Sequence, residues 1–489
     1  MRRKIYDKLL EWKQKSAGKT ALLIDGARRV GKSWIVEEFG RREYAACLII
    51  DFAHIPTKVK RIFNEYINDL DELFLLLSSV YHVELVRGNS LIVFDEVQRF
   101  PKAREAIKYL VKDGRYHYIE TGSLISIRRN VQNIVIPSEE RHLKMYPMDF
   151  EEFLWATGKT GIMSLLEKRF ETLTPLGADL HRQCMDIFRQ YMVVGGMPQA
   201  VQTFAETGSL AEVDAVKRDI LNLYKSDIGK FGGKSKHKIS DAFGNIPAQL
   251  SKHEKKYTLA DLEGQTKMRD YDVTFDWLKS SMIVNVAYNT TEPNVGLRLN
   301  ADRRTLKCYM GVTGLLVSHA FDENELASAD VHARILAGDI DMNEGMLVEN
   351  VVAQMLRTSG HKLYFYSKSD RDDNENRMEI DFLLSRSKTE RRANVSPIEV
   401  KSGKRYSLVS LEKFRRKFVR FIHTPYVVHC KDLKQQDGIV YLPIYMVPLL
   451  VANRIDFNPF QKFCGTWTED EVRELADRVG RETNDEDWT

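Results

Sequence analysis

Residues Gly26 to Ser33 have the composition and spacing of a phosphate-binding loop. They read Gly26-Ala27-Arg28-Arg29-Val30-Gly31-Lys32-Ser33 and fit the pattern G-x-x-x-x-G-K-S/T without a mismatch. An apolar run precedes them and a helical pattern follows, which is the context this motif requires. Glycines let the backbone wrap a phosphate chain, whose charge the N–H groups and the helix N-terminus bind. We therefore predict an ATP site in which Lys32 reaches the β and γ phosphates and Ser33 binds Mg²⁺. The alternative is an ordinary glycine-rich turn.

A pair of acidic residues supplies the second part of this chemistry. Asp95 and Glu96 follow the apolar run Leu91–Phe94, which predicts a buried strand. Asp95, at the carboxyl end of that strand, could hold Mg²⁺ through water, and Glu96 could polarise the attacking water as a general base. An apolar run that ends in two acids is weak evidence alone. After a phosphate-binding loop, it favours hydrolysis of the nucleotide over binding alone.

Three further residues are candidates for the same site. Thr121 or Ser123 could sense the γ-phosphate or position water, and a simple strand-ending turn fits the sequence equally well. Arg141 precedes an expected strand at Met145–Met148. It could stabilise charge on the phosphates, either in its own chain or on a neighbouring subunit of a homo-oligomer. A solvated basic residue is the alternative for Arg141.

These side chains need a parallel sheet to bring them together, and the first part of the chain predicts one. The 489 residues suggest about three domains at ~150 residues each. Residues 1 to about 155 alternate helical patterns with apolar runs, at 21–25, 47–51, 91–95 and 116–120. Runs of this kind are typical of parallel strands covered on both faces. The predicted fold class is therefore α/β.

The remainder of the chain predicts a helical middle region and a second α/β unit. From about 156 to 330 the periodicity is mostly helical. Within it, three helices and two short strands are expected between 239 and 299, the strands at 284–288 and 297–299, which suits a winged helix. After about 343, a helix precedes strands near 362–367, 379–384, 396–401 and 425–429.

Composition and charge are those of an ordinary globular protein. Hydrophobic residues make up 43% and charged residues 29%, which excludes wholesale disorder. The net charge is +4, so any nucleic-acid surface must be local. The five cysteines are scattered without a CxxC pair, which favours reduced thiols over a disulfide framework or a zinc site. The apolar stretch Ile439–Ala452 is too short to span a membrane, and we expect a soluble cytoplasmic protein without a membrane partner.

Together these motifs resemble a family of bacterial and archaeal AAA-superfamily ATPases that carry a C-terminal domain of uncharacterised function. The resemblance extends to about residue 450 and rests on the phosphate-binding loop and on Asp95-Glu96-Val97-Gln98, Thr121-Gly122-Ser123, Tyr146-Pro147-Met148-Asp149-Phe150-Glu151-Glu152-Phe153, Gly195-Gly196-Met197-Pro198, Tyr224-Lys225-Ser226-Asp227-Ile228 and Gly314-Leu315-Leu316. It implies an ATPase core (1–155), a helical lid (156–235), a winged-helix-like region (236–330) and a domain similar to PD-(D/E)xK nucleases (331–455), after which we expect a C-terminal tail (456–489). The chain departs from the family at Val312, where an Asp is usual, and in the tail, which has no counterpart.

The resemblance points to two strand-like segments near residues 380 and 400. In PD-(D/E)xK nucleases, an Asp and a Glu on adjacent strands bind a divalent metal, and here these would be Asp381 and Glu399. Lys401 follows Glu399 by two residues and so shares its strand face, where it could orient water or stabilise charge. Glu349 could add a carboxylate, and such oxygen ligands favour Mg²⁺ or Mn²⁺. A simple ion pair of Glu399 with Lys401 is the alternative.

Two basic stretches predict contact with DNA. One, with aromatic residues between its charges, comprises Lys401, Lys404, Arg405, Tyr406, Lys413, Phe414, Arg415, Arg416, Lys417 and Arg420. The other runs from Lys230 to Lys238 and could contact phosphates without reading sequence. A solvated helix face and a flexible linker are the respective alternatives.

These features favour an Mg²⁺-dependent ATPase whose ATP cycle controls a DNA-binding, nuclease-like C-terminal module. Two other functions use the same residues. One is a regulatory switch ATPase that binds protein or DNA and has an inactive C-terminal domain. The other is a structural adaptor that binds nucleotide without turnover.

Overall fold

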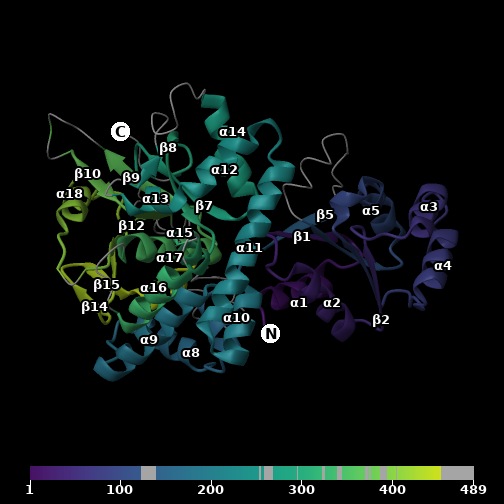
Figure 1. The fold of residues 1–489 in the computed structure, drawn as a ribbon, viewed down its shortest axis with the longest axis horizontal. Coiled ribbons are helices and arrows are strands. Elements are labelled where there is room, and N and C mark those ends of the chain that lie inside the picture. Colours follow the sequence, from purple (N-terminus) through teal and green to yellow (C-terminus); the bar gives the residue numbers. More distant parts are fainter. Residues whose placement is uncertain are drawn as a thin grey trace, which may run out of the picture.

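A computed structural model describes residues 1–122, 139–252, 255–257, 268–294, 296–321, 325–338, 344–368, 373, 376–385, 394–403 and 405–452. The predicted site residue Ser123, the basic residue Lys404 and the tail 456–489 lie outside these ranges. The described strands form three sheets of five strands each. Figure 1 shows the first sheet and its helices on one side of the molecule and the rest of the described chain on the other.

The first sheet is parallel throughout and confirms the predicted α/β fold. Its order is β2-β3-β4-β1-β5, with strands β1 Ala21–Gly26, β2 Ala46–Asp51, β3 Ser90–Asp95, β4 His117–Gly122 and β5 Glu140–Met145. The first four coincide with the apolar runs of the sequence. The fifth lies earlier than the expected Met145–Met148, because its partner β1 ends where Gly26 aligns with Met145 and Pro147 has no N–H for a ladder hydrogen bond.

Side chains along each strand point alternately to the two faces of the sheet. Because the buried strands are apolar on both faces, helices cover both faces of this sheet. Leu22 and Ile24 pack in one apolar core with α1 (Ile5–Lys15) and α2 (Lys32–Glu43). Leu23 packs in a second core with three other helices, α3 Thr57–Tyr66, α4 Leu70–Tyr81 and α5 Pro101–Asp113. Of the three strands at the centre of the sheet, β1 and β3 therefore read as nearly continuous apolar runs, and β4 is buried with polar residues near its end.

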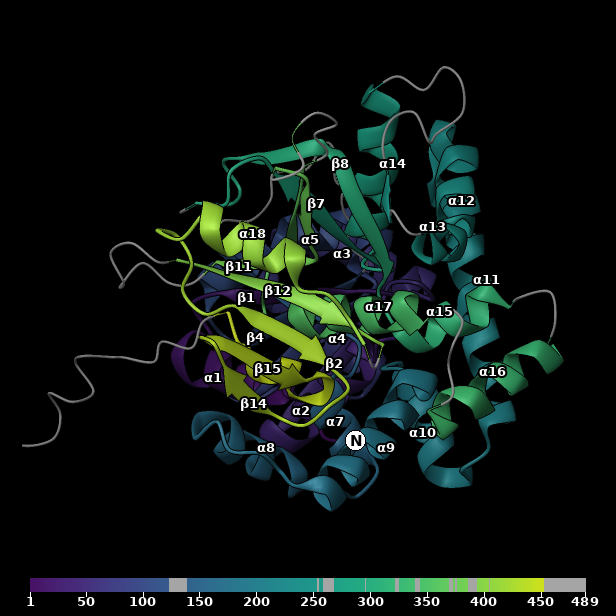
Figure 2. The same ribbon diagram turned by 90° about the vertical axis from the view of Figure 1, so that its left-hand side faces the viewer.

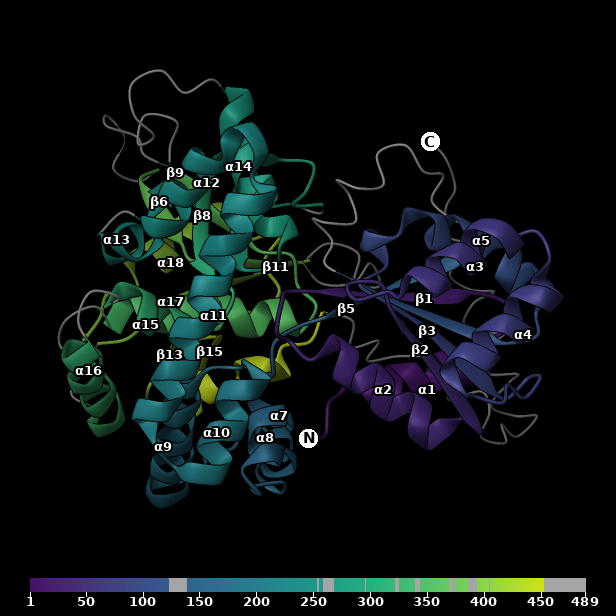
Figure 3. The same cartoon turned by 45° about the vertical axis from the view of Figure 1, so that its right-hand side comes forward.

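A helical region follows: α7 Phe150–Ala156, α8 Ile162–Glu171, α9 Ala178–Val194, α10 Pro198–Thr207 and α11 Leu210–Phe231. The long helix α11 stands between the first sheet's unit and the C-terminal sheets in Figure 1, and Figure 3 shows it beside α12 and α14. The basic stretch Lys230–Lys238, considered as a flexible linker, is almost wholly helical, since α11 passes through the short helix Gly233–Ser235 into α12 (Lys236–Gly244). Among the described helices, none is both long and apolar enough to cross a bilayer.

The second sheet joins the middle of the chain to its C-terminal part. After α12, helices α13 (Ile246–Ser251) and α14 (Met268–Ser280) precede the antiparallel pair β7 and β8. The sheet order is β10-β9-β7-β8-β6, with β6 Lys256–Tyr257, β7 Val284–Thr290, β8 Ala301–Met310, β9 Tyr364–Lys368 and β10 Met378–Ile380. The expected strand at 297–299 is a turn, and the observed strand β8 begins after it. Strands from both sides of residue 330 thus share one sheet.

The third sheet has the order β11-β12-β13-β15-β14 and lies near α17 (Glu344–Thr358) and α18 (Val409–Lys417), as Figure 2 shows. Its strands are β11 Phe382–Ser385, β12 Val395–Lys401, β13 Tyr426–His429, β14 Lys434–Gln436 and β15 Ile439–Pro443. The single strand expected at 379–384 is two strands, β10 and β11, which belong to different sheets. Asp381 occupies the break between them. This break places Asp381 at the boundary of the two sheets.

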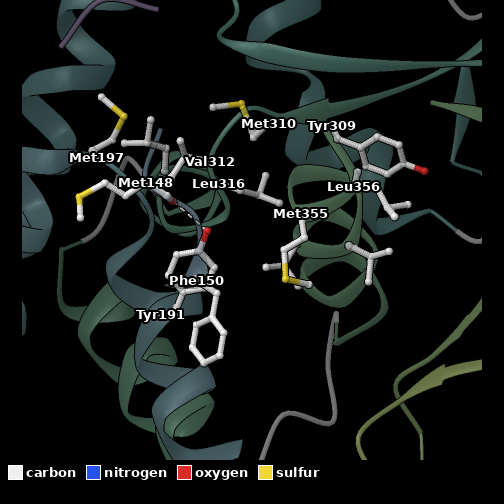
Figure 4. Close-up of a cluster of buried hydrophobic side chains, with 14 of the residues drawn as sticks. Met148, Phe150, Tyr191, Met197, Tyr309, Met310, Val312, Leu316, Met355 and Leu356 are labelled. Atoms are coloured by element: carbon white, nitrogen blue, oxygen red, sulfur yellow. Dashed lines mark hydrogen bonds between the residues drawn. The ribbon is translucent and has the colours of Figure 1, made fainter. Parts of the chain in front are cut away.

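A buried cluster packs the helical region against the C-terminal part. Figure 4 shows Met148, Phe150, Tyr191 and Met197 beside Val312, Leu316, Met310 and Met355. Val312 and Gly314, at the start of α15 (Thr313–Ala320), lie directly against Gly195. A Cβ on Gly314 would lie 2.7 Å from the Gly195 nitrogen, so two backbone segments touch here. The buried, apolar Val312 fits a packing role at the position where the family usually has Asp.

Candidate functional site

The phosphate-binding loop connects β1 to α2 at the carboxyl edge of the first sheet. Gly31 precedes α2 with a φ of 91°, which L side chains rarely adopt. A Cβ on Gly26 would lie 2.4 Å from the carbonyl oxygen of Met145, so only glycine fits there. Lys32 is buried, and its Nζ donates to the carbonyl oxygens of Gly26 and Ala27, each at 3.0 Å. Burial lowers the pKa of Lys32, while the charges of Glu96 and Asp95 oppose that shift.

The predicted Mg²⁺ ligands lie together beside this loop. The Ser33 hydroxyl donates to Asp95 Oδ1 at 3.0 Å, and the Thr121 hydroxyl donates to the same oxygen. Thr121 therefore belongs to the site through Asp95. Because hydroxyl and carboxylate oxygens are ligands that Mg²⁺ prefers, Ser33 and Asp95 fit the ion that the motif implies.

Glu96 is held in an unusual backbone conformation next to Asp95. Its φ of 52° is left-handed, and its N–H donates to the Thr121 hydroxyl at 3.4 Å. The Gln98 amide donates to a carboxylate oxygen of Glu96. Non-glycine residues in this region of φ/ψ space are uncommon and occur often at functional sites. The surroundings thus orient the carboxylate, and Gln98 is a positioning residue that the functional interpretation of the sequence missed.

Arg141 lies away from this edge of the sheet. In the pairing of β5 with β1, Arg141 aligns with Leu22, whereas Met145 aligns with Gly26. Four residues of strand, or about 13 Å, therefore separate Arg141 from the loop. The strand register does not support a role on the phosphates of its own chain. A role on a neighbouring subunit stays a prediction.

Contacts from other segments support the loop. The buried Arg3 donates to the carbonyl oxygens of Val30 at 3.0 Å and Tyr146 at 2.7 Å. From α11, Asp227 pairs with the exposed Arg28 at 2.7 Å, and the Tyr224 hydroxyl donates to the Arg28 carbonyl at 3.2 Å. Ala27 and Val30 are buried, whereas Arg29 is exposed. The family-like segment 224–228 thus contacts the loop directly.

In the C-terminal part, the structure brings Asp381, Glu399 and Lys401 together, as predicted. Strands β11 and β12 pair antiparallel, with Phe382 opposite Ile398. The Val400 N–H donates to Asp381 Oδ2 at 2.8 Å, and Lys401 Nζ lies 2.7 Å from Glu399 Oε1. All three line a cavity of about 500 Å³, which Glu349 and Glu379 also line. The ion pair considered as the alternative is therefore present within the converged cluster.

The sequence interpretation missed two lysines in this cluster. Lys307, on β8, is fully buried and lies 3.1 Å from Glu349, 2.8 Å from Glu379 and 3.5 Å from Asp381. Lys255 pairs with the other oxygen of Glu349, and the Tyr309 hydroxyl donates to Glu349. The signal for Lys307 was a single cation in the otherwise apolar run Leu306-Lys307-Cys308-Tyr309-Met310.

Burial and neighbouring charges raise the pKa of some carboxyl groups in this cluster and lower that of others. Burial and the neighbouring charge of Asp381 raise the pKa of Glu399 to about 8 despite Lys401. Burial and Glu349 likewise raise the pKa of Asp381. Burial would also raise the pKa of Glu349, but Lys307 and Lys255 outweigh it and hold that pKa at about 2. The site therefore contains both proton-retaining and strongly ionised carboxyl groups.

The predicted metal ligands Glu349, Asp381 and Glu399 do not form an open metal site in this arrangement. Within the described ranges, no three His, Cys, Asp or Glu side chains are grouped so that they could hold a metal ion. Instead, the Lys307 ammonium lies 3.1 Å from Glu349 and 3.5 Å from Asp381. Metal binding by these carboxylates stays a prediction. It requires the Lys307 ammonium to move away from Glu349 and Asp381.

The basic stretch after Lys401 is only partly available to a partner. Phe414 is fully buried in α18, where its ring contacts Tyr366 at 5.3 Å between centroids, so it cannot stack on a base. Arg415 donates to the carbonyl oxygen of Asp437 at 3.0 Å. Arg416, Lys417 and Arg420 are exposed. The surface therefore offers charges without the interleaved aromatic ring expected at Phe414.

Three family models match successive parts of the chain. Residues 18–154 match an AAA domain. Residues 185–325 match a domain of unknown function (DUF8612), and residues 344–447 match another domain of unknown function (DUF4143). None of the curated proteins matches this sequence.

Solved structures with distant similarity include the Orc1 protein of Aeropyrum pernix in complex with DNA, Cdc6p of Pyrobaculum aerophilum and an Hsp104–ADP complex of S. cerevisiae. The Orc1 match has 13% identity, covers 66% of this chain and 93% of that chain, and has a TM-score of 0.26. The Cdc6p match has 12% identity, covers 68% and 93%, and has a TM-score of 0.24. The Hsp104 match has 12% identity, covers 73% and 44%, and has a TM-score of 0.26.

Proposed function

We propose that this chain, whose residues 18–154 form an AAA-superfamily P-loop domain, is an Mg²⁺-dependent ATPase whose ATP cycle controls a DNA-binding, nuclease-like C-terminal module. The observation that carries the ATPase part is the meeting of Ser33, Asp95 and Thr121 beside the loop, with Glu96 next in the chain. Bound Mg²⁺ would neutralise charge on the β and γ phosphates. Ser33 and Asp95 would hold the ion, and Glu96 would take a proton from the attacking water.

Control of the C-terminal module is supported by a buried hydrogen-bond path from the first unit to α17. The Tyr191 hydroxyl donates to the Met148 carbonyl at 3.0 Å and accepts from the Gln354 amide at 2.7 Å. Gln354 in turn accepts from the Thr313 N–H at 2.8 Å. Met148 follows β5, whose last residue packs on the loop glycine Gly26. The same helix, α17, carries Glu349 into the C-terminal site.

Steady-state ATP hydrolysis by three proteins tests the proposed activity. The parent chain should turn over ATP, and Lys32→Ala should lose binding or turnover because the phosphates lose a point charge. Glu96→Gln should still bind ATP but hydrolyse it about 10²–10⁴-fold more slowly, the usual cost of losing a general base. An unchanged rate in Glu96→Gln would remove Glu96 from the role of base. ATP binding without turnover by the parent would favour the adaptor.

One observation favours the second candidate, a switch ATPase with an inactive C-terminal domain. Lys307 neutralises carboxylates that a nuclease would use to bind metal. Incubation of the protein with DNA, ATP and Mn²⁺ separates the two candidates. Cleavage that is lost in Asp381→Ala and Lys401→Ala supports the nuclease, and intact DNA with DNA binding retained supports the switch.

A further inference from the structure

The junction between the P-loop domain and the second sheet contains a basic cavity that the proposed active sites do not use. Its volume is about 430 Å³. The walls come from the end of β5, from α14, from β7 with the following residues 298–303, and from the end of α17 with residues 362–364. We call it the junction cavity.

Cations dominate the lining of the junction cavity. Among the described residues that line it are six cations and a single carboxylate, Asp276; the cations are Lys144, Lys279, Arg298, Arg303, Arg357 and Lys362. None of the six forms an ion pair within the described part of the chain. Their charges act on one another: burial lowers the pKa of Lys279, and Arg357, Arg303 and Lys144 lower it further against the opposing effect of Asp276. Unpaired cations that repel one another across a cavity are suited to an anionic ligand.

Two of these cations lie over tyrosine rings. Lys279 Nζ lies 4.6 Å from the ring centroid of Tyr288, and the Arg357 guanidinium lies 5.6 Å from that of Tyr146. Tyr364 also lines the cavity but is 8% exposed, so the partly exposed rings of Tyr146 and Tyr288 are the ones a base can reach. A cationic groove with aromatic side chains is the usual construction of a site for single-stranded nucleic acid, where phosphates meet the cations and bases stack on the rings.

We infer that the junction cavity is a binding cleft for single-stranded nucleic acid, an inference that rests on the proposed DNA binding and assigns its surface. The cleft is a different surface from the exposed basic face of α18. On that face Phe414 is buried and cannot stack on a base. Tyr146 forms one wall of the cleft. Arg3 donates hydrogen bonds to the carbonyl oxygen of Tyr146 and to that of Val30 in the phosphate-binding loop. A strand in the cleft therefore contacts Tyr146, a residue that Arg3 links to the phosphate-binding loop.

Three matched alanine triples test the inference, each of which removes three exposed cations. The cleft triple is Arg298→Ala, Arg303→Ala and Lys362→Ala; the α18 triple is Arg416→Ala, Lys417→Ala and Arg420→Ala; the remote control on α3 is Lys58→Ala, Lys60→Ala and Arg61→Ala. Binding of labelled oligothymidine and of a duplex is measured by fluorescence anisotropy from about 50 to 200 mM salt. Basal ATP hydrolysis of each triple, compared with the parent, checks that the fold is intact.

The cleft triple should lose about tenfold or more in affinity, and its salt slope should fall by about 2, since each phosphate contact on a single strand contributes about 0.7. The α3 control should bind like the parent. Loss of binding in the α18 triple with normal binding by the cleft triple would overturn the cleft while leaving DNA binding in place. Tighter binding of duplex than of oligothymidine by the parent would overturn the single-strand specificity. No binding of either DNA by the parent would instead contradict the proposed function itself.

Discussion

Lys307 is the residue on which the arrangement of the C-terminal site depends most. It is 1% exposed and contacts three carboxylates, Glu349 on α17, Glu379 on β10 and Asp381 in the break between β10 and β11. Attraction to these carboxylates outweighs the effect of burial, which would lower its pKa, and raises that pKa well above the usual value. A cation of this kind offsets the cost of burying several negative charges close together.

Lys307→Met should therefore destabilise the protein by about 3–5 kcal/mol, because it leaves buried carboxylates without their partner. Thermal unfolding of the variant, with and without Mn²⁺, measures this loss. If Glu349 and Asp381 can ligate a metal once Lys307 is absent, Mn²⁺ should recover part of the stability in the variant and little in the parent. The double variant Lys307→Met with Asp381→Asn, which lacks one of these ligands, is the control. An unfolding temperature equal to that of the parent would contradict the stabilising role of Lys307.

At this scale, the sequence predicts residues that belong to a short local motif better than residues that do not. Lys32 and Ser33 were predictable from the phosphate-binding loop, and Asp95 and Glu96 from the acidic end of an apolar run. The Lys255, Lys307 and Glu379 contacts were not, because they depend on how β8 and β10 are placed around α17. The register of β5 also decides where Arg141 lies, and a local pattern does not reveal register.

At the scale of elements, the contact between α15 and the end of α9 is tight enough to exclude a methyl group. A Cβ on Gly314 would meet the Val194 carbonyl oxygen and the Gly195 nitrogen, both at 2.7 Å and both backbone atoms. Backbone cannot move aside as a flexible side chain can. The glycines of the two family-like segments 195–198 and 314–316 are thus explained by close packing.

Gly314→Ala should cost about 1–3 kcal/mol of stability, the usual range for overpacking a core. Urea unfolding of the variant measures the loss. Gly229→Ala is the matched control, since Gly229 lies within α11 and a Cβ there would meet nothing within 4 Å. This control should gain about 0.5–1 kcal/mol because alanine favours a helix. Equal stability of Gly314→Ala and the parent would show that the two segments separate easily.

The elements of the first sheet could be predicted because the central strands β1 and β3 are buried on both faces and read as nearly continuous apolar runs, and β4 is buried although it carries Glu120 and Thr121 near its end. The strand β8 was missed because its first half, Ala301–Thr305, is polar and partly exposed and so lacks the apolar pattern of a buried strand. The break at Asp381 was missed for a related reason. The apolar pattern continues across 379–384, but the flanking halves pair with β9 and β12 in different sheets.

At the scale of the whole molecule, the second sheet links the helical region to the C-terminal site, and α17 contacts both. Asn350 on α17 accepts from the Met310 N–H at 2.8 Å, and Gln354 reaches Tyr191 on α9. Glu349 of the same helix enters the acidic cluster. Under the proposed function, a shift of Met148 or Tyr191 during the ATP cycle reaches Glu349 through α17, which contacts Tyr191 through Gln354.

Hydrogen exchange of the α17 amides, residues 344–358, tests this central claim most directly. Glu96→Gln should trap the ATP-bound state, and addition of Mg²⁺ and ATP should change the exchange rates of α17 as well as those of α2. Lys32→Ala, which we expect to lose its hold on the phosphates, should show no change in either helix. A change confined to α2 in Glu96→Gln, with α17 exchanging as it does without nucleotide, would contradict control of the C-terminal module by ATP.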